Sequence, residues 1–145
     1  MELAFDDILQ SGSPRAEKAK LIAERIRAQR GYPWAGIYDV SDREIRMVSC
    51  AGRGEPAIPS FPSDKGLNGR AVSQGKTVVV NDTSSDEDYL LTFRNTRSEV
   101  VVPVRNAQGR VVGTIDVEGE ATNAFHDEDV RFLEGCAIKI VGLWE

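Results

Sequence analysis

Three acidic residues lie in two late segments that are otherwise rich in valine. Asp116 and Glu118 are separated by one residue, so in a strand their side chains project from the same face. If Glu99 lies opposite them on a paired strand, three carboxylates meet at one site. Crowded carboxylates raise one another's pKa or bind a cation such as an ammonium group. The alternative is that these acids line a solvated face of the sheet, as charged strand residues commonly do.

Two aromatic residues follow the same rule in an earlier segment. Trp34 and Tyr38 belong to an aromatic and β-branched stretch typical of a strand, and their spacing places them on one face. The face of an aromatic ring attracts a cation. Together with the acids, these two residues predict a pocket that binds an amine.

A glycine-rich segment offers a complementary site for an anion. Gly66, Leu67 and Asn68 stand where a short helix is expected to begin, and free N–H groups at a helix start suit a carboxylate or small oxyanion. The alternative is a tight turn that needs glycine. With the acids across the same pocket, the ligand would be a zwitterion, and the long polar segment 83–97 would cover it.

Thiol and imidazole chemistry has little support. The two cysteines are Cys136, in an apolar stripe of the last helix, and Cys50, at the end of a strand with Arg53 as its nearest basic neighbour. Structural roles are favoured for both, because no second cysteine is placed to resolve an oxidised Cys50. His126 is the sole histidine and is expected near a helix N-cap, so we predict no metal site and no cofactor.

The elements that must position these residues alternate between helical and strand patterns. We expect Ser13 and Pro14 to begin a helix as its N-cap and first residue. Residues 52–62 are expected to form a loop, and the long polar stretch 83–97 fits either a loop or a short helix. The expected helices are residues 13–30, 67–72 and 126–143, and the strands are residues 34–40, 45–48, 77–80, 100–104 and 111–117.

Composition limits the class of protein. A chain of 145 residues with 41% hydrophobic residues suits one domain over residues 1–145, with a helical segment at 1–31 and a core at 32–145. A net charge of −5 and a pI near 5.0 disfavour nucleic-acid binding. We expect no signal peptide and no membrane span, and two cysteines fit a reducing cytoplasm.

Five segments in this order resemble the GAF domain family. They read WAGIY at 34–38, GLNGRAV at 66–72, VVVND at 78–82, SEVVVPV at 98–104 and VGTIDV at 112–117. The sequence AFHDED at 124–129 is similar to the turn that opens the family's last helix. The resemblance implies an α+β fold with an antiparallel sheet of five or six strands, the terminal helices on one face and a ligand pocket on the other.

Within that family the chain looks closest to the free methionine-(R)-sulfoxide reductases. Those enzymes hold the amino acid with an aromatic pair and late acidic residues, which match Trp34, Tyr38, Glu99, Asp116 and Glu118. They also need cysteines around the small helix and in the long polar loop, where this chain has Asn68 and no cysteine at 82–97. The resemblance therefore implies the binding site without catalytic residues, and a protein that is not an enzyme.

Three functions follow as hypotheses. The first is a cytoplasmic sensor module that binds an amino-acid-like zwitterion or an anion and acts in trans on a partner such as a sensor kinase. The second is a thiol enzyme similar to the reductases, and the third is a scaffold that only dimerises. A homodimer formed through the terminal helices is expected from the family.

Overall fold

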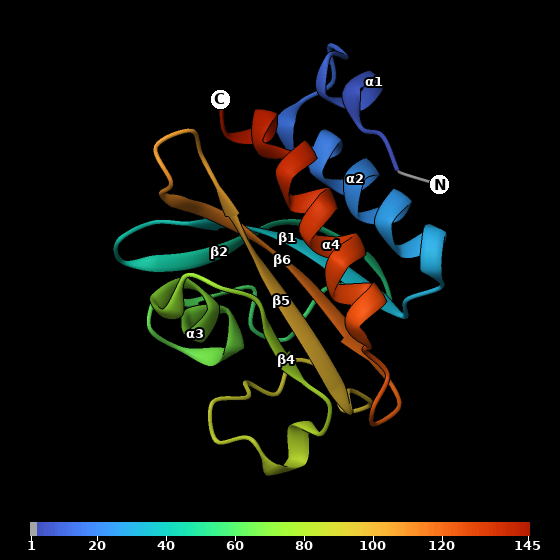
Figure 1. Ribbon diagram of the computed structural model, residues 1–145, viewed down its shortest axis with the longest axis vertical. Helices are drawn as coiled ribbons and strands as arrows, with labels where there is room; N and C mark the ends of the chain where they lie inside the picture. Colours follow the sequence, from blue (N-terminus) through green and yellow to red (C-terminus); the bar gives the residue numbers. More distant parts are fainter. Residues whose placement is uncertain (1–2) are drawn as a thin grey trace.

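One antiparallel sheet organises the chain, of which the computed structural model describes residues 3–145 (Figure 1). Its six strands lie in the order β3-β2-β1-β6-β5-β4, and each neighbouring pair is antiparallel. The strands are β1 (Trp34–Val40), β2 (Glu44–Gly52), β3 (Ser60–Pro62), β4 (Val78–Val80), β5 (Ser98–Arg105) and β6 (Val111–Gly119). The predicted α+β antiparallel architecture is therefore confirmed.

Two long helices cover one face of the sheet. Helices α2 (Arg15–Arg30) and α4 (Asp127–Lys139) run side by side across it in Figure 1. Their apolar stripes, as predicted, are buried against the alternate strand residues that point to this side. The central strands contribute Ala35, Ile37, Val100, Val102, Val104, Ile115 and Val117 to this core, and the helices contribute Ala19, Ile22, Ala23, Ile26, Leu133, Cys136 and Ala137.

Short helical turns close the two ends of this layer. Helix α1 (Asp6–Leu9) packs Ile8 into the core, and the 3-10 turn η2 (Val141–Trp144) follows α4. The indole N–H of Trp144 donates to Asp39 at the end of β1, at 2.7 Å. In the part of the chain that the structure describes, no helix combines the length and the apolar character needed to cross a membrane.

The opposite face of the sheet carries the smaller elements. Helix α3 (Gly66–Gln74) packs on β4 and β5, and the segment 83–97, which begins with the 3-10 turn η1 (Thr83–Ser85), follows β4. The strand residues that point to this side are of a different kind. From β1, β5 and β6 they include two aromatic and three acidic side chains, all buried: Trp34, Tyr38, Glu99, Asp116 and Glu118. The face opposite the long helices is therefore the one that gathers the predicted site residues.

Three local predictions were wrong. The helix begins at Arg15 with Pro14 at the N-cap, so Ser13 does not cap it. Residues 60–62 form the edge strand β3 instead of a loop, because Phe61 is buried while its strand pairs with the start of β2. The last helix ends at Lys139, and the residues that follow tighten into η2.

The helix–sheet interface gives a first prediction. Replacing buried Leu133 by alanine should lower the free energy of unfolding by about 2–5 kcal/mol, because it leaves a cavity against the sheet. Arg131 lies on the same helix and is exposed, so Arg131→Ala is the matched control and should be nearly neutral. Urea unfolding measures both changes, and equal effects would contradict the assigned faces of α4.

Candidate functional site

The three acids predicted from spacing form one buried cluster. Glu99 on β5 lies directly opposite Glu118 on β6, and Asp116 lies two residues earlier on the same face. Their carboxylate oxygens come within 4.8 Å of one another. The residues are only 5%, 3% and 1% exposed for Glu99, Asp116 and Glu118. The alternative of a solvated sheet face is therefore wrong, and we call these three residues the carboxylate cluster.

Neutral polar side chains supply most of the hydrogen bonds to this cluster. Asn68 on α3 donates to Asp116 Oδ2 at 2.9 Å, and Thr114 Oγ1 donates to Asn68 Oδ1 at 2.6 Å, which orients the amide. Thr96 donates to Glu118 Oε1 at 2.6 Å, and Thr92 donates to Glu118 Oε2 at 2.9 Å. The other oxygen of Asp116, Oδ1, is buried and accepts no hydrogen bond from an N–H or hydroxyl group, and the carboxyl group of Glu99 is hydrogen-bonded to Asp116 when it holds a proton. An unpartnered buried carboxylate oxygen is costly, so it marks a place where a donor would be favourable.

Burial and mutual repulsion shift the titration of the cluster. Among the described residues none of the three acids forms an ion pair. Burial, followed by the charges of Asp116 and Glu118, raises the pKa of Glu99 well above its usual value. Burial also raises the pKa of Asp116, and it raises the pKa of Glu118 from 4.5 to about 7. Near neutral pH the cluster therefore either holds protons or is stabilised by a bound cation.

Two aromatic side chains from β1 border the carboxylates. Trp34 pairs with Glu118 across β1 and β6, and its indole lies over Gly36, where an added Cβ would be 2.4 Å from the ring. The indole N–H donates to the Gly54 carbonyl at 2.9 Å. Burial, followed by the charges of the three acids, raises the pKa of Tyr38. The structure thus brings both predicted aromatic residues beside the cluster and adds Gly36, whose missing side chain makes room for the indole.

The 83–97 segment lies over the carboxylates. Its Thr92 and Thr96 bond Glu118, and Phe93 packs against Trp34 with ring centroids 5.4 Å apart. A salt bridge of 2.8 Å between Arg70 on α3 and Asp86 holds the start of the segment. With this segment in place, the cluster is closed from solvent.

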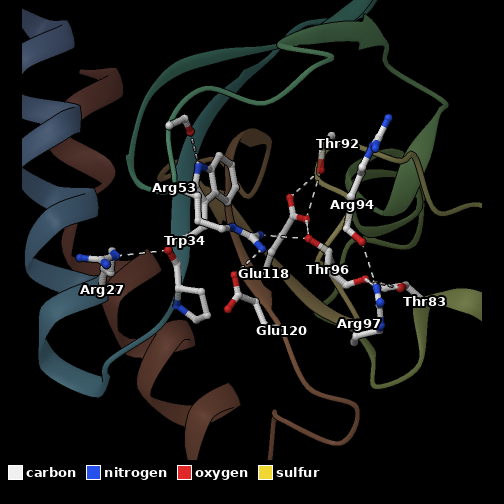
Figure 2. A network of polar contacts seen from close by, with 12 residues as sticks. Arg27, Trp34, Arg53, Thr83, Thr92, Arg94, Thr96, Arg97, Glu118 and Glu120 are labelled. Carbon is white, nitrogen blue, oxygen red and sulfur yellow. Dashed lines mark hydrogen bonds and ion pairs between the residues drawn. The ribbon is translucent and has the colours of Figure 1, made fainter.

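Arg53, expected from the sequence only as the nearest basic neighbour of Cys50, also lies at this site. It follows β2 and donates to Thr96 Oγ1 at 3.0 Å and to Glu120 Oε2 at 2.9 Å (Figure 2). Its guanidinium stacks on Phe93 at 4.3 Å. Through Thr96, it is one hydroxyl group away from Glu118. In the sequence, Arg53 is a single arginine in a glycine-rich loop, and such a pattern does not predict where the side chain lies in the fold.

The start of α3 contributes fewer residues to the site than the sequence predicted. Asn68 reaches the cluster, but the side chain of Leu67 packs into a separate apolar group with β4 and β5. At Gly66, with φ of +72°, an added Cβ would be 2.9 Å from Leu90 of the 83–97 segment. Leu90 therefore packs against the first residue of α3.

The remaining sulfur and imidazole groups lie apart from the carboxylates. Cys50 is half-buried, its Sγ is 3.6 Å from the Gly54 carbonyl, and burial raises the pKa of its thiol. Cys136 is buried in the helix–sheet core, where burial raises the pKa of its thiol to about 12. His126 occupies the N-cap of α4, as expected, and its backbone N–H donates to Asp129 at 2.9 Å.

The prediction of no metal site rested on histidine and cysteine ligands alone. The carboxylate cluster has the spacing to offer three oxygen ligands to an ion. Carboxylates suit both hard metal cations and ammonium groups.

Comparison with known proteins gives a consistent result. Residues 17–137 match the model of the GAF domain family. The chain is 28% identical over 100 residues to Protein YtsP of Bacillus subtilis, and 30% identical over 105 residues to free methionine-R-sulfoxide reductase of Saccharomyces cerevisiae. The solved structure of type II free methionine-R-sulfoxide reductase from Thermoplasma acidophilum has a TM-score of 0.83 at 27% identity, covering 89% of this chain and 91% of that chain.

The matches to the Bacillus and yeast proteins cover only part of the length of each of those proteins. The matched regions cover 69% and 72% of this chain, but 61% of the Bacillus protein and 58% of the yeast protein.

The raised pKa of Glu118 gives a second prediction. A carboxyl group whose pKa is higher in the folded state stabilises the fold below its ordinary pKa of 4.5 and loses that contribution as pH rises through about 7. The free energy of unfolding should therefore fall between about pH 5 and 8, by at most about 1.4 kcal/mol per pH unit for one group. Denaturant titrations at several pH values should show a shallower fall in Glu118→Gln.

The control for this pH profile is a carboxylate on the surface. Glu17 on α2 is exposed, so Glu17→Gln should follow the wild-type profile. A Glu118→Gln profile parallel to the wild type would show that Glu118 does not titrate in this range.

Proposed function

The chain belongs to the GAF domain family, and we propose that it is a sensor module that binds a small amino-acid-like zwitterion at the carboxylate cluster. The ammonium group of the ligand donates to the cluster, and Trp34 and Tyr38 form the adjoining aromatic wall. The 83–97 segment opens to admit the ligand and closes over it.

The observation that carries this proposal is the buried Oδ1 of Asp116, to which no N–H or hydroxyl group donates and beside which lies only the carboxyl group of Glu99. Asp116 is 3% exposed, and its second oxygen is already bonded to Asn68. The group that fits Oδ1 is a donor, and a positively charged donor also relieves the repulsion from Glu99 and Glu118. An ammonium group meets both requirements in one contact.

A ligand that is only an anion fits this site less well. Three carboxylates would repel it, and the side chain of Leu90 packs against Gly66 at the start of α3. Among the two ligand classes expected from the sequence, the zwitterion is therefore the one we propose.

The output of the sensor is the second part of the proposal. In this view the protein acts in trans in the cytoplasm, by contact with a partner such as a sensor kinase, and forms a homodimer through α2 and α4. Leu21 on α2 and Ile138 on α4 support this arrangement, because both are apolar and are 38% and 76% exposed.

The test of ligand binding uses substitutions that remove charge but keep shape. Asp116→Asn should weaken binding of an amino-acid ligand at least about tenfold, since a charged hydrogen bond contributes about 1.5–3 kcal/mol. Glu99→Gln should have a smaller effect, because this carboxyl already favours its protonated form. Thermal-shift screening of amino acids and their sulfoxides, followed by calorimetry, provides the affinities.

The matched control is a buried acid on the helix-covered side of the sheet, at the start of α4. Asp129 accepts hydrogen bonds from Tyr32 and Arg30 at the start of α4, so Asp129→Asn should change stability without changing affinity. Tighter binding of nitrate or nitrite than of any amine, unaffected or improved by Asp116→Asn, would refute the zwitterion and favour an oxyanion sensor.

A reductase is the second candidate, favoured by the names of the similar proteins. Against it, the sequence has two cysteines, one in the helix–sheet core and one bonded to a loop carbonyl. We therefore expect background NADPH consumption with methionine-(R)-sulfoxide and a thioredoxin system. Turnover that disappears in Cys50→Ser would instead establish the thiol enzyme.

A further inference from the structure

Arg53 has a donor that its neighbours leave unused. Its two terminal nitrogens bond Glu120 and Thr96, but Nε is buried without a partner. The guanidinium is fixed in orientation, because it also stacks on Phe93. Figure 2 shows it beside the side chain of Trp34, with Thr96 and Glu118 on its other side. A fixed guanidinium with a free N–H is suited to bind a carboxylate.

Three buried side-chain atoms lack a hydrogen-bond partner in residues 3–145, and all three adjoin the carboxylate cluster. They are Asp116 Oδ1, Arg53 Nε and the hydroxyl of Tyr89. Arg53 reaches Glu118 through Thr96. The charges of Glu118 and Glu99 act on Tyr89, whose pKa is raised to about 12, mainly by burial. Asp116 Oδ1 can only accept a hydrogen bond, Arg53 Nε can only donate one, and the hydroxyl of Tyr89 can do either.

Building on the function proposed above, we infer that Arg53 binds the carboxylate of the zwitterion and thereby selects amino acids over simple amines. The sequence had suggested the start of α3 for this role, where Leu90 now lies against Gly66. At Arg53 a carboxylate would break neither existing hydrogen bond, because Nε has no partner while the other two nitrogens keep theirs.

The placement of Arg53 also specifies how the two charges of the ligand are separated. Thr96 Oγ1 accepts from Arg53 and donates to Glu118, so a single hydroxyl separates the cationic from the anionic side of the site. Glu118 and Asp116 have oxygens within 4.8 Å of one another, so the ammonium site at Asp116 lies near Arg53 and suits a ligand whose ammonium and carboxylate are close together, as they are on one carbon atom. The class of ligand is therefore an α-amino acid with a free amino and a free carboxyl group.

The test compares ligands that differ by one charged group. The probes are methionine-(R)-sulfoxide, its decarboxylated form 3-(methylsulfinyl)propylamine, and its N-acetyl derivative. Calorimetry measures each on wild type, Arg53→Gln and Arg70→Gln. Arg70 is the matched control, because it also holds the 83–97 segment, through Asp86 and Asp88, but leaves no buried donor free.

We expect the wild type to prefer the amino acid over the amine at least about tenfold, the effect of one charged hydrogen bond. Arg53→Gln should remove this preference, because it should lower the affinity for the amino acid and leave the affinity for the amine unchanged. Arg70→Gln should lower the affinity for both ligands by the same factor or for neither, so the preference for the amino acid should persist.

The opposing outcomes separate the inference from the proposed function. Equal affinity of the wild type for amino acid and amine, or equal losses for both in Arg53→Gln, would overturn the role of Arg53 and leave the ammonium site standing. Binding of the N-acetyl derivative as tightly as the amino acid, or binding of none of the probes, would contradict the proposed function itself.

Discussion

The burial of three like-charged side chains is the interaction on which the ligand-facing half of the molecule depends. Carboxylates within 4.8 Å of one another are unfavourable without compensation, and the fold supplies it from distant parts of the chain. Asn68 comes from α3, and Thr92 and Thr96 come from the 83–97 segment. Helix α3 and the 83–97 segment are thus both held against the sheet by hydrogen bonds to acids of β6, which couples their positions.

The alternation of side chains along three strands separates scaffold from site. On β6, Ile115 and Val117 enter the helix–sheet core, while Asp116 and Glu118 enter the opposite layer. The helices α2 and α4 can therefore pack tightly without constraining what the other face binds. This division explains how one family retains a common architecture while the chemistry of the site differs among its members.

Sequence patterns predicted the features that depend on strand periodicity, and missed those that depend on loops. The spacing of Asp116 and Glu118, and of Trp34 and Tyr38, was sufficient because a strand places alternate residues on one face. The position of Arg53 has no such rule, since it depends on Thr96 and Phe93, which are remote in sequence. Pairing at β3 was missed for the same reason, because only the contact with β2 makes that short segment a strand.

The two outermost strands are each three residues long, and this has a consequence for association between copies. An exposed strand can recruit another chain through its unpaired N–H and C=O groups, and long flat edges invite uncontrolled polymerisation. Here β3 and β4 offer few such groups, and Pro62 removes one donor from β3 outright. A second copy consequently finds little to pair with at either border of the sheet, so stable self-association would have to use side-chain packing on other surfaces.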